Sequence, residues 1–312
     1  MRSHSLLWIP APAALLLLAS ATLSAAVDPA LLDMAPPDTR VLFGLEVQQA
    51  LASPFGHFVL SRMPEQTAAL LHFAATTGFD LRRDLRELLL ASSSGLRGKP
   101  LQDGVILARG VFERGVFETG KLSTLAGNMH ARVSSYAGVP VIVPADPASS
   151  FIAILDASTL AVGSESAVEG VIKRRQQRFL FSGPLADKAR AASVNMDAWM
   201  ATVTPLEDLI STAAGPWPST FAQAVTESAA SLRFDTGGVT LSAEVLTRSG
   251  SEAVALAGMF KIVAGMVKGS PAALLQNARF TSEGAIARAT LTIAEEDLEN
   301  AFPAPVQGRA AR

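Results

Sequence analysis

The sequence predicts an α+β protein in which mostly antiparallel sheets carry helices packed on one face. Short stretches of alternating hydrophobicity meet at turn residues, as in hairpins, and helix-length amphipathic stretches lie between them. Of the 312 residues, 49% are hydrophobic and 17% are charged, against a usual charged share of about 25%. Such a chain has enough apolar surface to form a core. At roughly 150 residues per domain, its length predicts two domains.

The first 26 residues have the layout of a secretory signal peptide. Arg2 supplies a positive charge, residues 6–18 are an apolar run, and small residues lead up to Ala26. Cleavage there would leave a chain that begins at Val27. An uncleaved N-terminal anchor is the alternative, and the prolines and small residues of the segment argue against it. We therefore expect an exported, soluble protein, periplasmic or extracellular.

The first domain is expected over residues 27–182, where spacings of three and four predict helices and alternation predicts strands. Its expected elements are, in order, an irregular lead-in (27–39), a strand (40–47), helices (48–63 and 64–78), strands (84–92 and 104–111), a helix (113–126), hairpins (130–143 and 151–163), and a helix that begins at a capping box of Ser166 and Glu169.

The second domain is expected over residues 183–302, after a connector over 179–191, with a loose tail at 303–312. Its expected elements are a strand (194–200), helical turns (205–228), a hairpin (230–247), a long helix (251–268), a hairpin (278–293) and a short acidic helix (295–302). Both halves thus follow the order strand, helices, hairpin, helix, hairpin, and the first adds one hairpin and one helix. A duplicated unit would explain this order. The similar stretches GSESAV and GSEAVA lie at non-equivalent places in it.

Charge, cysteine content and span length exclude several classes of protein. The formal net charge is −2, without the basic excess that nucleic-acid binding needs. The absence of cysteine excludes disulfides, thiolate nucleophiles and cysteine-based metal sites. The most apolar stretch after the leader, residues 253–267, contains Lys261 and is shorter than the roughly 20 residues of a membrane span.

Catalytic signals are sparse after the leader. The three histidines are His57, His72 and His130, and the two in expected helices, His57 and His72, lack the second ligand at helical spacing that a metal pair needs. No G-x-S-x-G, S-x-x-K, phosphate-loop or dinucleotide motif occurs. Asp80 and Asp84 stand among arginines, which favours charge pairing over acid–base chemistry. The sequence therefore predicts no catalytic residue, metal or cofactor, although acids distant in the chain could still meet in a hydrolase.

Two stretches are candidate binding surfaces. The helix expected over 251–268 is apolar nearly all round, which is typical of a helix that is buried on several sides or covers a cavity or a partner. Its candidate surface residues are Leu256, Met259, Phe260, Val263, Met266 and Val267. The second stretch is a basic run that either contacts anionic lipids or polyanions or forms a solvated helix end. Its residues are Lys173, Arg174, Arg175 and Arg178.

Four segments carry a family resemblance. They are TRVLFGLEVQQALASPFGHFV, TGFDLRRDLRELLLASS, YAGVPV and LAVGSESAVEGVIKRR, within residues 38–178. With some of the second half, they resemble a family of uncharacterised exported bacterial proteins. The resemblance implies an exported α+β protein and brings no catalytic residues.

Three functions remain open at this point. The first is non-enzymatic binding of an envelope protein or surface, which an exposed contiguous apolar patch would favour. The second is a carrier for an apolar ligand such as a lipid, which an enclosed apolar cavity beside the helix over 251–268 would favour. The third is a hydrolase, which two inward carboxylates in a polar cleft would favour. No oligomeric state is predicted.

Overall fold

The computed structural model describes residues 26–62, 74–75, 78–93, 104–112, 121–128, 130–146, 149–205, 223–235, 237–267, 274–275 and 277–297. Most of the signal peptide, most of the helix expected over 64–78, much of the helical turns expected over 205–228 and the tail lie outside these residues.

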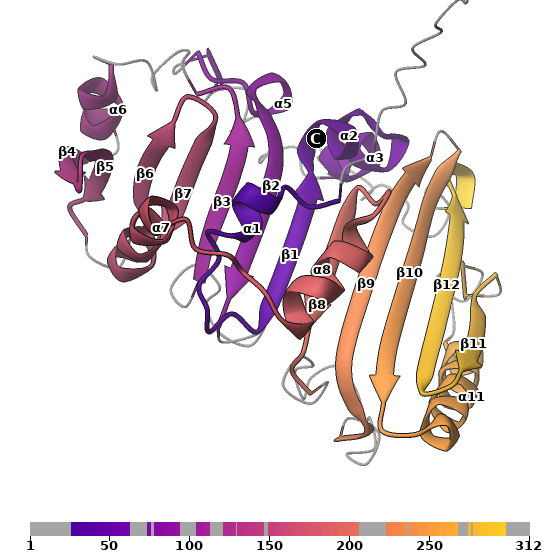
Figure 1. Cartoon of the computed structure of the whole chain (residues 1–312). Helices are drawn as coiled ribbons and strands as arrows, with labels where there is room; N and C mark the ends of the chain where they lie inside the picture. Colours follow the sequence, from indigo (N-terminus) through magenta and orange to yellow (C-terminus); the bar gives the residue numbers. More distant parts are fainter. Residues whose placement is uncertain are drawn as a thin grey trace, which may run out of the picture.

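The described strands form one antiparallel sheet, which Figure 1 shows from edge to edge. They are β1 (Val41–Glu46), β2 (Leu85–Ser92), β3 (Gly104–Gly110), β4 (Ala131–Tyr136), β5 (Val139–Pro144), β6 (Phe151–Asp156), β7 (Thr159–Gly163), β8 (Ala198–Thr202), β9 (Val225–Asp235), β10 (Gly238–Thr247), β11 (Arg279–Glu283) and β12 (Ile286–Ala294). Their order is β11-β12-β10-β9-β8-β1-β2-β3-β7-β6-β5-β4.

The helices lie on both faces of this sheet. They are α1 (Pro29–Leu32), α2 (Val47–Ala52), α3 (Pro54–Arg62), α5 (Leu81–Asp84), α6 (Leu122–Asn128), α7 (Glu165–Gln177), α8 (Pro184–Ser193) and α11 (Gly250–Met266). Helices α1, α7 and α8 share one face, whereas α2 and α11 pack against strand residues that point to the other face. The described residues contain no helix that is both long and apolar enough to cross a membrane.

The α+β class is confirmed, and the described strands follow a repeated order in the two halves. Strands β1 and β8 pair in the middle of the sheet, with Leu45 opposite Ala198. From β1 the sheet continues through β2, β3, β7 and β6, and from β8 it continues in the same pattern through β9, β10, β12 and β11. The hairpin β4–β5 and helix α7 are the additions in the first half. The domain boundary at 182/183 stays a prediction, since one sheet runs through both halves.

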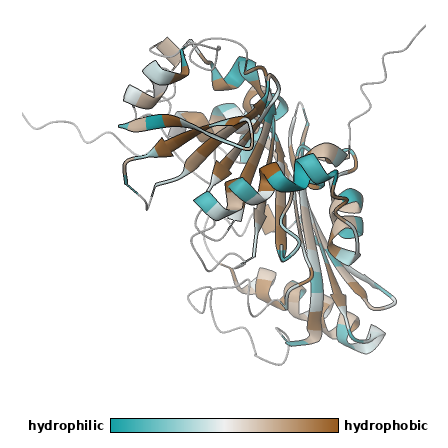
Figure 2. Ribbon diagram, turned by 60° about the vertical axis from the view of Figure 1, so that its left-hand side comes forward, coloured by the Kyte–Doolittle hydropathy of each residue, from teal (hydrophilic) through white to brown (hydrophobic). Residues whose placement is uncertain are grey.

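The main core lies between the sheet and the helices α1, α7 and α8. Leu42, Leu89 and Leu107 of the central strands are fully buried there. Figure 2 shows these strands as largely hydrophobic, with hydrophilic stretches on the helices that cover them. The lead-in expected to be irregular contributes to this core, because Leu31 and Leu32 of α1 are also fully buried. Asp28 caps α1, and Pro29 occupies its first turn, where a missing N–H costs nothing.

Three further local expectations were wrong. The expected connector over 179–191 contains helix α8, which buries Leu185 and two alanines against the sheet. Helix α7 begins at Glu165 and not at a capping box of Ser166 and Glu169, because the hydroxyl of Ser164 accepts the amide N–H of Ala167. The single helix expected over 48–63 is two helices, which meet at Ser53 in an extended conformation. An extended residue is the usual conformation before a proline such as Pro54.

Candidate functional site

Helix α11 buries one side against the last strands of the sheet. Ala253, Leu256 and Ala257 pack against Val245 of β10 and Ala287 of β12. Farther along the helix, the ring of Phe260 lies 6.2 Å from the ring of Phe280 on β11. Of the candidate surface residues, Leu256 therefore faces the sheet. Met259, Phe260 and Val267 are half-buried, and Val263 and Met266 are exposed.

The opposite side of α11 is exposed and apolar. Val254, Ile262 and Met266 are 62%, 59% and 70% exposed. With Gly258 they recur at every fourth residue, so they form one ridge along the helix. A Cβ added at Gly258 would meet no atom within 4 Å, which leaves open space in the middle of the ridge. We call these four residues the α11 ridge.

One hollow of about 760 Å³ lies beside α11, over β11. It opens to solvent, and Lys261 and Arg279 line it together with Val267 and Phe280. An open hollow with two cations differs from the enclosed apolar cavity that a lipid carrier would need. The apolar character of this region therefore belongs to the outer surface of the helix.

The basic run on α7 is divided among separate intramolecular contacts. Lys173 lies 3.7 Å from Glu169 and over the ring of Tyr136. Arg174 is half-buried and donates to the carbonyl of Met34 over 2.9 Å. These contacts follow from helix geometry, because consecutive residues point about 100° apart.

The other two basic residues of the run lie at the end of α7. Arg175 forms an ion pair of 2.6 Å with Asp156 on β6. Arg178 is exposed and ends the helix in the left-handed conformation. An anion-contacting patch built from all four residues stays a prediction.

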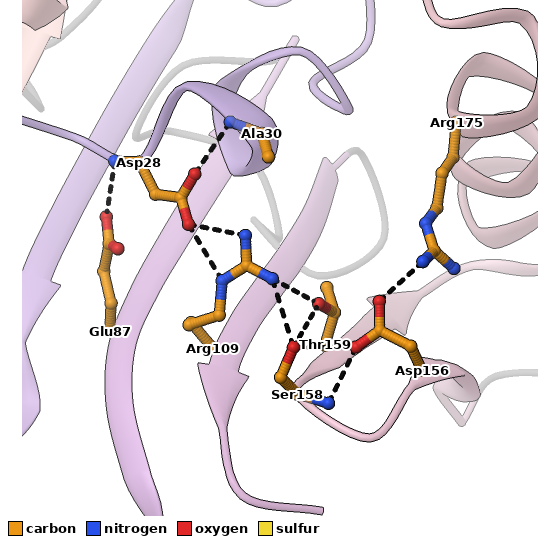
Figure 3. A network of polar contacts seen from close by, with 8 residues as sticks. All are labelled: Asp28, Ala30, Glu87, Arg109, Asp156, Ser158, Thr159 and Arg175. Carbon is orange, nitrogen blue, oxygen red and sulfur yellow. Dashed lines mark hydrogen bonds and ion pairs between the residues drawn. The ribbon is translucent and has the colours of Figure 1, made fainter.

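A polar network surrounds Arg109 of β3 (Figure 3). Two of its guanidinium nitrogens donate to one carboxylate oxygen of Asp28, and a third donates to the hydroxyl of Thr159 over 2.6 Å. Ser158 connects this group to Asp156 and so to Arg175. The network therefore joins the start of the described chain, β3, the β6–β7 turn and α7.

Two glutamates lie next to this network on the same sheet face. Glu87 of β2 is opposite Glu46 of β1, and Arg109 is opposite Glu87 on the other side. Glu87 is 8% exposed, and burial raises its pKa to about 7. Burial, and then repulsion by Asp197, also raises the pKa of Glu46. Glu87 accepts the backbone N–H of Asp28, so the chain at Asp28 lies directly against this carboxylate.

Acids elsewhere on the sheet pair with cations. A hollow of about 320 Å³ between α8 and strands β9, β10 and β12 is lined by Lys188, Glu244 and Arg288. Glu244 is 2.8 Å from Arg288, and Lys188 is 2.9 Å from Glu227. Such neutralised acids differ from the two free inward carboxylates that a hydrolase would need.

The arginine-rich turn before β2 was interpreted correctly from the sequence. Asp80 pairs with Arg82, and the buried Asp84 pairs with Arg83. Sequence reasoning missed the group of Asp28, Glu87 and Arg109. The available signal was a charged residue at a core-facing position of two apolar strands, LRELLLAS and GVILARG.

Comparisons with known proteins bear on the fold. No family model matches the chain, and no curated protein matches it. The crystal form IV structure of a protein named TP0453 is similar, with a TM-score of 0.53 and 10% identity over 87% of this chain and 94% of that one. Crystal form III gives a TM-score of 0.51 and 12% identity over 87% and 96%. The fold is shared with TP0453. At this identity the likeness shows the fold alone.

Proposed function

We propose that this protein is an exported, non-enzymatic binding protein whose α11 ridge docks an apolar segment of an envelope protein. The observation that carries the proposal is the exposed ridge itself. Monomeric proteins rarely leave a contiguous apolar surface exposed unless it is a site of interaction. Between Val254 and Met266 the only charged residue is Lys261, so this side of the helix has little polar surface.

The energetics fit a docking surface. Val254, Ile262 and Met266 are each more than half exposed. Burying a side chain of this kind completely contributes about 1.5–3 kcal/mol, so covering the three exposed parts contributes on the order of 3–5 kcal/mol. Part of this gain offsets the entropy that association costs, so the ridge alone supports binding of modest affinity.

The residue types favour a polypeptide over a lipid surface. Helices that lie in a membrane interface combine bulky apolar residues with a polar face rich in Lys and Arg. The α11 ridge instead has Gly258 between Val254 and Ile262, and Gly265 beside Met266. Small residues let the backbone of a partner helix approach closely, and longer side chains on both sides fill the remaining space.

The proposed location rests on the leader and on the family resemblance. The apolar run of residues 6–18 and the small residues before Val27 are those of an exported chain. The partner would therefore be met in the cell envelope or outside the cell.

The test places a photo-crosslinking amino acid at Ile262 in the full-length protein, expressed in its own host. Irradiation should join the protein to one polypeptide, and native mass spectrometry of the purified envelope fraction should show the same added mass. A Met266→Glu substitution in the same chain should abolish this product. Leu180→Glu is the matched control, because Leu180 is 72% exposed on a different surface, and it should leave the product unchanged.

Several results would overturn the proposal. A crosslink that survives Met266→Glu would show that the ridge does not hold the partner. A doubled mass would assign the ridge to a second copy of the chain. An added mass of a few hundred daltons that is released as lipid on denaturation would favour the carrier function.

A further inference from the structure

Val27 and Asp28, at the start of the described chain, are fixed by several hydrogen bonds. Val27 is 3% exposed, and its backbone nitrogen donates to the hydroxyl of Ser193 at the end of α8 over 3.0 Å. The next nitrogen, that of Asp28, donates to Glu87 over 3.3 Å. The side chain of Asp28 caps α1 and pairs with Arg109 (Figure 3). Chain ends are commonly loose, so these contacts fix the position of Val27.

The surroundings of Val27 carry an excess of negative charge. Asp28, Glu46 and Glu87 meet near the first strands, and Arg109 is paired with Asp28. Asp197 immediately precedes the neighbouring strand β8, and Arg233 and Asp235 lie near it. In the part of the chain that the structure describes, neither Glu46 nor Glu87 forms an ion pair with a lysine or arginine. Arg109 attracts Glu87 but already pairs with Asp28, so a second positive charge here would stabilise the ionised carboxylates.

We propose that cleavage of the Ala26–Val27 bond supplies this charge, because the new α-ammonium group of Val27 stays in place and pairs with Glu87. In the cleavage a signal peptidase adds water across the peptide bond. Ala26 leaves with the new carboxylate, and the new amine of Val27 takes up a proton at neutral pH. The charge of the new N-terminus then contributes to the stability of the folded protein.

The geometry brings the two groups near each other. Neighbouring backbone nitrogens lie about 3–4 Å apart, so the nitrogen of Val27 is within about 7 Å of the Glu87 oxygen that accepts from Asp28. A change in the side-chain torsions of Glu87 would complete the ion pair. The hydroxyl of Ser193 already accepts from this nitrogen and would accept equally from an ammonium group. An amide N–H at Val27 carries no net charge, so in the uncleaved chain Glu87 avoids its buried charge by binding a proton, as its raised pKa shows.

The sign of the pH dependence distinguishes the two forms. With an amide at Val27, the raised pKa of Glu87 means that its ionisation costs stability, which falls as the pH rises from about 4.5 to 7. With an ammonium group at Val27, the pKa of Glu87 falls. Stability from the pair is then lost as the pH drops through the lowered Glu87 pKa, and again as the pH rises through the pKa of the amine.

The experiment compares two forms of the protein at pH 7. One is the chain exported through its own leader, whose first residue should be Val27 by intact mass. The other begins six residues earlier, at Ala21, so that Val27 keeps an amide and the α-ammonium group is six residues away from it. We expect the form that begins at Val27 to melt about 5 °C higher. Glu87→Gln should remove this difference, whereas Glu283→Gln, at the far edge of the sheet, should leave it unchanged.

A second measurement does not depend on the folding of a variant. Acylation of the α-amine at pH 7 should be about tenfold slower in the form that begins at Val27, because its amine is buried and paired. A mature chain that starts elsewhere would overturn the proposal. So would equal acylation rates, or a melting difference that Glu87→Gln leaves intact.

Discussion

Helices α7 and α11 begin alike and differ in what they turn outward. Ser164 caps α7 and Ser249 caps α11, and each hydroxyl accepts the amide N–H three residues later at 3.3 Å. Each helix also buries three side chains near its start or middle. The outer side of α7 is charged, with Lys173 and Arg175, whereas the outer side of α11 is the apolar ridge.

This difference shows that the features that place a helix on the sheet do not determine which residues lie on its outer side. The caps and the buried sides are sufficient to place both helices on the sheet. An apolar outer side adds nothing to folding and lowers solubility. The ridge therefore needs a reason other than stability, which is the basis for the proposed docking role.

The largest difference in stability is expected between a charge placed on the buried side of α7 and a charge placed on the exposed ridge of α11. Val171→Glu puts an unpaired carboxylate into the main core beside fully buried neighbours and should cost more than about 4 kcal/mol of unfolding free energy, enough to prevent folding. Ile262→Glu on the ridge should change stability by less than about 0.5 kcal/mol. Soluble yield and urea unfolding followed by circular dichroism measure both. A destabilised Ile262→Glu variant would mean that the ridge packs within the protein.

Truncation of the buried sides should affect the two helices equally. Ile172→Ala on α7 and Leu256→Ala on α11 each remove a side chain that is almost fully buried. Each should lower the free energy of unfolding by about 2–5 kcal/mol. Urea titrations of the two variants provide the values. A loss of less than about 1 kcal/mol of unfolding free energy for Leu256→Ala would mean that α11 is only loosely attached to the sheet. The two helices would then not be held in the same way.

The caps should have smaller and matched effects. Ser164→Ala and Ser249→Ala each leave one amide N–H without its acceptor and should cost about 1 kcal/mol. Thermal melting of both variants tests this expectation. The conservative replacement by Asp should restore most of the loss, since Asp also accepts at this position.

The smallest effect is expected for the charges on α7. Lys173 is exposed and lies 3.7 Å from Glu169, so Lys173→Ala should change stability by less than about 0.5 kcal/mol. Urea unfolding at low and high salt provides the measurement. A larger loss at low salt would show that the basic run stabilises the helix more than an ordinary exposed pair does.

Sequence patterns predicted the hairpins best. Alternation located β4–β5, β6–β7 and β11–β12 closely, because in each hairpin a turn of only two residues joins the strands. Helix α8 was missed because its inward residues include Ala186 and Ala189, which carry little hydrophobic signal. The start of the chain was missed because its prolines suggested irregular structure, although Pro29 opens a helix.

The candidate surface was predicted in part. The sequence predicts that α11 is apolar on all sides. Apolar residues on every side do not show which side of the helix packs against the sheet. Leu256 was therefore expected at the surface and lies against β10 and β12, while Val254 and Ile262, absent from the expected set, are exposed. Glu87 and Arg109 come from separate strands, and only the register of β2 with β3 brings them together.

The pairing of β1 with β8 has a consequence for the time course of synthesis. Leu45 is opposite Ala198, so about 150 residues must emerge after β1 before its second neighbour exists. At 5–20 residues per second, β1 spends roughly ten seconds or more as an open sheet edge. Until then the first half exposes a row of free backbone N–H and C=O groups, which other strands can bind. This interval is where the nascent chain most needs protection by a chaperone.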